Sequence, residues 1–165
     1  KSTDTIKFYK KPDDDSVIIV AIRGSADMSD VYADLQIATV GVKTSARYQK
    51  DLVTMQQVKQ QYPNATYYGV GHSLGGALAD QFIADGYIKT AVCYNPAVEK
   101  KYLSSPLNYR IYMENDPLYN TMGKYSRIGE VRPQGPVSKL DTIASAQSLA
   151  AHKLSNFVGG RRIYV

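Results

Sequence analysis

A Gly-X-Ser-X-Gly pentapeptide is the feature that most constrains the fold of this chain. It runs from Gly71 to Gly75, with Ser73 at its centre. Residues 65–70 before it form a short apolar run typical of a buried strand, and residues 76–83 after it carry apolar side chains at helical spacing. A serine between two glycines at such a junction is typical of a tight strand-to-helix turn, where a side chain in place of either glycine would collide with neighbouring backbone. The pattern therefore predicts that the Ser73 hydroxyl projects from the end of a strand.

Apolar and amphipathic segments alternate along the rest of the chain. Two apolar runs, 5–9 and 16–22, flank a turn containing Pro and Asp, which predicts a β-hairpin. Val17–Ile22 contains no polar residue, so we expect this strand to be covered on both faces. The other expectations are strands over 65–70, 88–94 and 109–113, helices over 45–62, 98–103 and 138–151, a short helix or lid-like loop over 27–37, and a loop over 132–136. This alternation predicts one α/β domain, residues 1–165, with a mostly parallel central sheet flanked by helices.

Composition narrows the class of protein. The chain has 165 residues, of which 44% are hydrophobic and 21% charged, as in an ordinary globular domain. No apolar run approaches the ~20 residues that span a bilayer. The one cysteine, Cys93, cannot form an internal disulfide, and its apolar surroundings in the sequence predict an inert buried thiol. The chain begins at Lys1, so the removal of a leader stays open and the compartment is not predicted.

The charge pattern bears on partners. The formal net charge is +5, and basic residues occur in scattered pairs such as Lys10-Lys11 and Arg161-Arg162. Such scatter argues against a nucleic-acid partner, whereas a weak peripheral contact with anionic lipid stays open. The sequence has no zinc-type Cys/His spacing and no phosphate-binding glycine loop, so we expect neither a metal nor a cofactor.

A serine hydroxyl is a poor nucleophile near neutral pH, so a catalytic Ser73 needs a base. The sequence holds two histidines, His72 and His152. His72 is adjacent to Ser73 in the turn, so its side chain should leave the turn in a different direction. This elimination favours His152 as the base. The alternative is an idle serine in a glycine-rich turn.

The imidazole in turn needs an orienting acid, which in the serine–acid–histidine order lies between the other two residues. The carboxylates in that interval are Asp80, Asp85, Glu99, Glu114, Asp116, Glu130 and Asp141. Asp116 directly follows a predicted buried strand, at the carboxyl edge where parallel sheets place their chemistry. Glu114 is adjacent but would still belong to the strand. We therefore select Asp116, for which a simple Asn-Asp-Pro turn is the alternative reading.

Acyl transfer also needs donors for the negative charge that develops on the carbonyl oxygen. The backbone N–H of Leu74, directly after the serine, is one candidate. Gly24-Ser25, at the end of an earlier predicted strand, is the other, since glycine allows close approach of the backbone and Ser25 offers an N–H and a hydroxyl. We interpret the preceding Arg23 as a structural anchor.

Several blocks, taken in order, resemble one family, the fungal-type triacylglycerol lipases (lipase class 3) of the α/β-hydrolase superfamily. The matching blocks are residues 18–25 (IIVAIRGS), 30–35 (DVYADL), 67–79 with GHSLGGALA, 94–96 (YNP) and 115–118 (NDPL). The resemblance implies a small, reduced α/β-hydrolase fold. It also implies Ser73 as nucleophile, Asp116 as orienting acid, His152 as base, and Ser25 with Leu74 as oxyanion donors.

Three functions follow as hypotheses. The first is a serine carboxylester hydrolase of lipase or esterase type that cleaves lipid or small esters through an acyl-enzyme. The second is a phospholipase A acting on membrane phospholipid, suggested by the positive charge and the 14 tyrosines. The third is a catalytically idle lipase-like module, suggested by the absence of the family's His-x-Gly-Phe segment.

Overall fold

The computed structural model describes residues 2–25, 40–133, 152 and 157. The segments 27–37 and 138–151, expected as a short helix or loop and as a last helix, lie outside the described residues. Most of the loop expected over 132–136 lies outside them as well. Among the described helices, none is both long and apolar enough to cross a membrane.

The described strands form a six-stranded sheet in the order β1-β2-β3-β4-β5-β6. Their bounds are β1 Ile6–Lys11, β2 Asp14–Ile22, β3 Thr66–His72, β4 Thr90–Tyr94, β5 Asn108–Met113 and β6 Glu130–Arg132. β1 and β2 form the expected antiparallel hairpin, and every later neighbour pair is parallel. The mostly parallel sheet of an α/β fold is thereby confirmed. Because the parallel strands share a direction, their carboxyl ends meet at one edge.

Three α-helices accompany the sheet in the described part of the chain: α2 Ala46–Gln61, α3 Leu74–Ala84 and α4 Pro117–Thr121. Short 3-10 turns occupy Val42–Thr44, Lys100–Tyr102 and Gly123–Tyr125. Ser45 caps α2, accepting a hydrogen bond from the Tyr48 N–H, and the helix ends before Pro63 as the sequence predicted. The expected helix over 98–103 is only the 3-10 turn.

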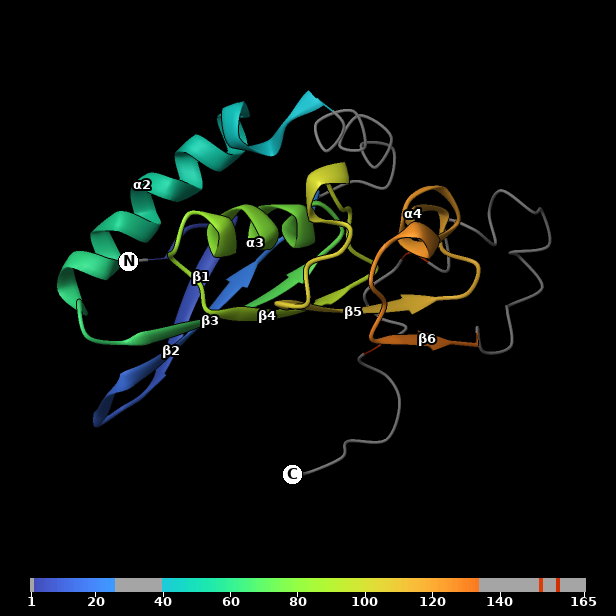
Figure 1. Cartoon of the computed structure of the whole chain (residues 1–165). Helices are drawn as coiled ribbons and strands as arrows, with labels where there is room; N and C mark the ends of the chain where they lie inside the picture. The colour runs from blue at the N-terminus through green and yellow to red at the C-terminus, as the bar shows by residue number, and fades with distance from the viewer. Residues whose placement is uncertain (1, 26–39, 134–151, 153–156, 158–165) are drawn as a thin grey trace.

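The hydrophobic core lies between the sheet and the pair α2 and α3, which cover the same face (Figure 1). Alternate residues of each strand point to this face, as the two-residue period of a strand requires. In β2 these are Ile18, Val20 and Ile22, all at most 3% exposed. The ring of Tyr48 of α2 packs against that of Phe82 of α3 with centroids 4.8 Å apart, which ties the two helices together over the sheet.

The opposite face of the sheet is much less covered. Val17, Val70 and Val92 are 41%, 37% and 37% exposed, on three successive strands. The expectation that Val17–Ile22 would be covered on both faces was therefore wrong for Val17. An unbroken apolar run does not distinguish a strand buried on both faces from one whose second face is apolar and accessible.

Two further elements differ from the sequence-based expectation. β6 occupies Glu130–Arg132, where no strand was predicted, and its three residues pair with Ile111 to Met113 of β5. α4 was not predicted either, because its five residues are too few for a helical period to register.

Candidate active site

Ser73 lies between the last residue of β3 and the first residue of α3. Its backbone angles, φ 55° and ψ −125°, fall outside the regions that L-residues favour. A Cβ built on Gly71 would lie 2.7 Å from the Gly75 carbonyl oxygen, and one on Gly75 would lie 2.2 Å from the Ile22 carbonyl oxygen. The flanking glycines are thus required by close backbone approach, as the pentapeptide predicted. The turn directs the Ser73 side chain to the carboxyl edge of the sheet.

Three side chains meet at this edge. The imidazole Nε2 of His152 lies 2.8 Å from the Ser73 Oγ, and its Nδ1 lies 2.6 Å from the Asp116 Oδ2. All three residues are at most 3% exposed. They are separated by 36 and 79 positions in the sequence, so only the fold brings them together. The structure thus joins, in one hydrogen-bonded chain, the three residues selected from the sequence.

Asp116 is held by the start of α4. Its Oδ1 accepts hydrogen bonds from the backbone N–H groups of Leu118 and Tyr119, at 2.8 and 3.1 Å, as the N-cap of that helix. Pro117 occupies the first turn, where a missing N–H costs nothing. The Asn-Asp-Pro turn and the acid are therefore not alternatives, because one oxygen caps the helix and the other faces His152.

The hydrogen bonds define the tautomer of His152. A carboxylate oxygen only accepts, so the Nδ1 of the imidazole donates its proton to Asp116. Nε2 is then left with its lone pair and accepts from the Ser73 hydroxyl. This is the arrangement in which an imidazole can take a proton from a serine.

The two sequence-predicted oxyanion donors lie around Ser73. Leu74 is the first residue of α3, and the N–H of a first helical residue has no carbonyl four positions earlier within the helix. A Cβ built on Gly24 would lie 2.6 Å from the His72 carbonyl oxygen and 2.9 Å from the Ser73 Cβ, so the loop after β2 passes directly beside the serine. Ser25 follows in that loop. Its hydrogen-bonding role toward a substrate stays a prediction.

Arg23 differs from its predicted role. Its side chain is exposed, and the anchoring of this loop comes from Arg47 of α2, whose guanidinium donates to the carbonyl oxygens of Thr5 and Arg23. Arg47 is itself held by an ion pair with the buried Asp51, at 2.7 Å. Sequence reasoning missed Arg47, because a helical arginine carries no local sign of a contact 24 residues away.

His72 contacts the backbone of His152. Its Nε2 lies 2.7 Å from the backbone oxygen of His152, and the two imidazole rings lie 4.9 Å apart. Burial, together with the neighbouring His152, lowers the pKa of His72 to about 4, against a smaller opposing effect of the hydrogen bond. The hydrogen bond of this side chain therefore goes to the His152 backbone, whereas the Ser73 hydroxyl contacts the His152 ring. Its contact with His152 was not foreseen.

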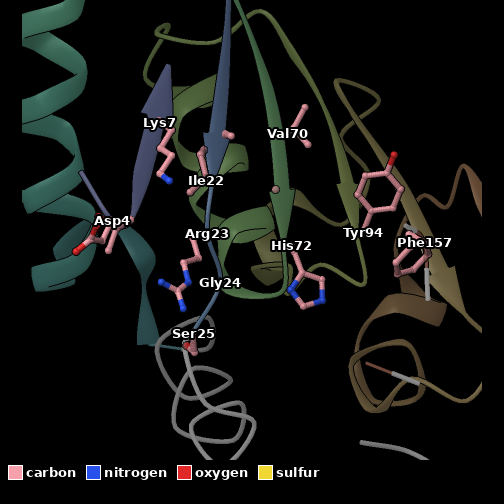
Figure 2. Close-up of a pocket in the computed structure, with 13 residues that line it drawn as sticks. Asp4, Lys7, Ile22, Arg23, Gly24, Ser25, Val70, His72, Tyr94 and Phe157 are labelled. Carbon is pink, nitrogen blue, oxygen red and sulfur yellow. The ribbon is translucent and has the colours of Figure 1, made fainter. Parts of the chain in front are cut away.

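A cavity of about 670 Å³ lies beside His72 on the face of the sheet opposite α2 and α3, called here the open face (Figure 2). Apolar side chains of neighbouring strands, including Val70 and Tyr94, form its floor, and Gly24 and Ser25 reach its edge. Phe157 closes one side, with its ring 4.8 Å from that of Tyr94. The cavity therefore meets the loop that carries the predicted oxyanion donor Ser25.

Neither a metal-binding cluster nor an exposed thiol is found among the described residues. No group of three or more His, Cys, Asp or Glu side chains there could hold a metal ion. Cys93 is fully buried in β4, and burial raises the pKa of its thiol to about 12. The predicted burial of this thiol is thus confirmed.

Comparisons with known proteins give matches only among solved structures. No protein-family model matches the chain, and no curated protein does. The structure is similar to the Lip2 lipase of Yarrowia lipolytica, with a TM-score of 0.49 and 20% identity over 74% of this chain and 60% of that one. It is similar to a fungal lipase at 0.47 and 17% over 84% and 70% of the two chains. A mutant of MDLA from Penicillium cyclopium gives 0.47 and 22% over 87% and 68%.

Proposed function

We propose that this chain is a serine carboxylester hydrolase of lipase or esterase type. The observation that carries the proposal is the continuous hydrogen-bonded chain from Ser73 through His152 to Asp116, at 2.8 and 2.6 Å. A buried serine in a strained turn, a base with its lone pair toward the hydroxyl and an acid fixed by a helix cap together support nucleophilic catalysis.

The first half-reaction forms an acyl-enzyme. His152 takes the hydroxyl proton on Nε2 while the Ser73 Oγ attacks the ester carbonyl carbon. The Asp116 carboxylate stabilises the resulting imidazolium through Nδ1–H. The tetrahedral intermediate then collapses, the bond to the alcohol oxygen breaks, and His152 returns its proton to the departing alcohol.

The second half-reaction releases the acid. A water molecule gives a proton to His152 as its oxygen attacks the acyl carbon, and collapse expels the Ser73 Oγ, which takes the proton back. In both halves the negative carbonyl oxygen accepts hydrogen bonds from the Leu74 N–H and from Ser25. The positive end of α3, which begins at Leu74, favours the same charge.

Active-site labelling tests the proposal. A fluorophosphonate probe should label Ser73, identified by peptide mass spectrometry, and Ser73→Ala should abolish labelling. The same substitution should lower kcat for p-nitrophenyl butyrate by on the order of 10⁴-fold or more. Ser16→Ala, in the exposed hairpin, is the matched control and should retain both activities. Labelling that survives Ser73→Ala would overturn the assignment, and a folded protein that takes no probe would favour the idle lipase-like module.

Phospholipase A activity is a second candidate with an observation in its favour. On the open face at the hairpin edge, Lys10 and Lys11 border a cavity with Tyr9 and Val17, which are 55% and 41% exposed. Exposed apolar and aromatic groups beside cations suit contact with anionic lipid. The test compares fatty-acid release from anionic and zwitterionic vesicles with turnover of p-nitrophenyl butyrate. Lys10→Gln/Lys11→Gln should lower only the activity on anionic vesicles, and equal activity on both vesicle types would exclude a role for this edge.

A further inference from the structure

His72 and Tyr94 form a pair at the carboxyl end of the sheet. They are register partners on β3 and β4, and both side chains point to the open face (Figure 2). Each contacts a residue from the far end of the chain. His72 contacts His152, and the ring of Tyr94 packs against that of Phe157 with centroids 4.8 Å apart.

The contact made by His72 differs in kind from the other two contacts of His152. Ser73 and Asp116 bind the two ring nitrogens, so they fix the ring but exchange protons or charge with it during turnover. His72 binds the backbone oxygen, at 2.7 Å. A carbonyl oxygen only accepts, so Nε2 of His72 carries the proton and donates it. This bond holds the main chain from which the imidazole extends, and it does not change when the imidazole gains a proton.

We propose that His72 is a positioning residue, whose Nε2–H hydrogen bond to the His152 backbone oxygen holds the catalytic imidazole between Ser73 and Asp116. The inference rests on the proposed function. Its physical basis is that proton transfer requires the imidazole to stay within hydrogen-bond distance of both partners, and a displacement of about 1 Å can cost ~10²-fold in rate.

The chemistry of an imidazole suits this position. The ring of His72 lies 4.9 Å from that of His152, which becomes an imidazolium in the proposed reaction. A lysine or arginine donor here would place a second positive charge against it and disfavour the proton transfer. His72 is neutral above about pH 4, because burial lowers its pKa. It therefore donates a hydrogen bond without adding a charge.

Three substitutions of His72 distinguish the effect of the donated hydrogen bond from the effect of the space that the ring fills. In His72→Gln the amide nitrogen can reach the position of Nε2 and donate to the same carbonyl, whereas His72→Leu fills similar space without a donor. His72→Asn carries a donor that falls short of that position. We expect His72→Leu to lower kcat for p-nitrophenyl butyrate by roughly 10- to 100-fold. The KM should change by less than about 2-fold, since the bond acts on the reacting group and not on substrate binding. His72→Gln should recover most of the loss and His72→Asn should not.

Val92→Thr is the matched control, because Val92 lies on the same face of β4, 37% exposed, and does not line the cavity. It should retain the wild-type kcat. If His72→Leu does not fold, the comparison of His72→Gln with His72→Asn carries the test. Equal loss in all three His72 variants, or no loss in His72→Leu, would overturn the proposal.

A second readout does not depend on ester turnover. The proton that His152 Nδ1 shares with Asp116 should give a downfield resonance in the proton NMR spectrum of the wild type. The resonance should persist in His72→Gln and be lost or broadened in His72→Leu. An unchanged resonance in His72→Leu overturns the proposal even if the enzyme is active. If the wild type turns over no ester, the proposed function fails separately, and the NMR comparison still decides whether His72 holds His152.

Discussion

Asp80 and Asp116 are two of the buried carboxylates in the described residues, and each binds a basic side chain with a different consequence. Asp80 of α3 pairs with Arg110 of β5 at 3.0 Å, and the two side chains are 1% and 0% exposed. Asp116 pairs with His152 at 2.6 Å, and these side chains are 0% and 1% exposed. Burial and partner distance therefore do not distinguish the two pairs.

The surroundings of the basic partner do distinguish them. The Arg110 guanidinium also donates to the backbone oxygens of Tyr102, Ser105 and Arg127, so it ties together two connecting segments, one before β5 and one after it. A guanidinium does not lose its proton in proteins, so this pair cannot transfer a proton. Burial raises the pKa of Asp80, and the Arg110 charge opposes this rise without cancelling it.

His152 instead binds Asp116 through one ring nitrogen and a hydroxyl through the other. An imidazole can gain and release a proton near neutral pH, whereas a guanidinium cannot. The comparison teaches that a buried acid–base pair becomes a candidate for catalysis through what lies beyond its basic partner. Beyond Arg110 lie backbone oxygens, and beyond His152 lies the hydroxyl of Ser73.

The largest effect expected from this contrast is on turnover. Asp116→Asn should lower kcat by about 10⁴-fold, because an amide nitrogen facing Nδ1 favours the tautomer with the proton on Nε2, which cannot accept from Ser73. Stability should change little, since asparagine caps a helix as well as aspartate does. Steady-state kinetics and thermal unfolding measure the two quantities. A kcat within 10-fold of the wild type would show that Asp116 only caps α4.

The second effect is on stability. Asp80→Asn removes the charge partner of the fully buried Arg110 and should lower the free energy of unfolding by about 3–5 kcal/mol. The kcat per active site, counted by fluorophosphonate titration, should stay near the wild-type value. Urea unfolding followed by circular dichroism gives the free energy. A loss below about 1 kcal/mol would mean that Arg110 is compensated by backbone oxygens alone.

The third effect is on the pH dependence of stability. The pKa of His72 falls from its ordinary 6.5 to about 4 on folding, so between these pH values the unfolded chain binds more protons than the native one. His72 therefore stabilises the fold fully above pH 6.5, and this contribution, on the order of 3 kcal/mol, is lost as the pH falls toward 4. The nearby charged groups Asp4, Lys7 and Arg23 line the same cavity and are exposed.

The measurement is the free energy of urea unfolding at several pH values from 7 to 4, in the wild type and in His72→Gln. Other titrating groups are common to both proteins and largely cancel in the difference. The wild type should lose more stability over this range than the variant. Parallel curves would show that His72 does not titrate in the native state with a lowered pKa.

The two carboxylates also show which features of this structure could be predicted from the sequence and which could not. The turn at Ser73 was predictable because its chemistry is local: two glycines, one serine, and a strand and a helix on either side. Asp116 was predictable because it directly follows a buried strand. These inferences use neighbours in the chain and the general rule that parallel strands end at one edge.

Contacts between distant residues gave no such signal. Nothing local marks Asp80 as the partner of Arg110, 30 residues away, and the sequence alone favoured neither a pair nor a role for either. His72 was set aside as a base on the expected direction of its side chain, and that argument did not consider the backbone of His152. β6 was missed because three residues are too few to show a strand period.

A third carboxylate gives the smallest expected effect. Asp85 accepts from Tyr48 and pairs with Lys43 at 2.9 Å, where the Lys43 side chain is 60% exposed. Burial raises the pKa of Asp85, but hydrogen bonds to Tyr48, Lys43 and Gln81, with the Lys43 charge, together outweigh this effect and lower the pKa overall. Because solvent screens this pair, Lys43→Ala should lower the free energy of unfolding by only ~0.2–1 kcal/mol, and less at high salt. Urea unfolding at 0.05 and 1 M NaCl tests this. A loss as large as that of Asp80→Asn, or one insensitive to salt, would mean that burial of the basic partner does not decide what an ion pair contributes in this fold.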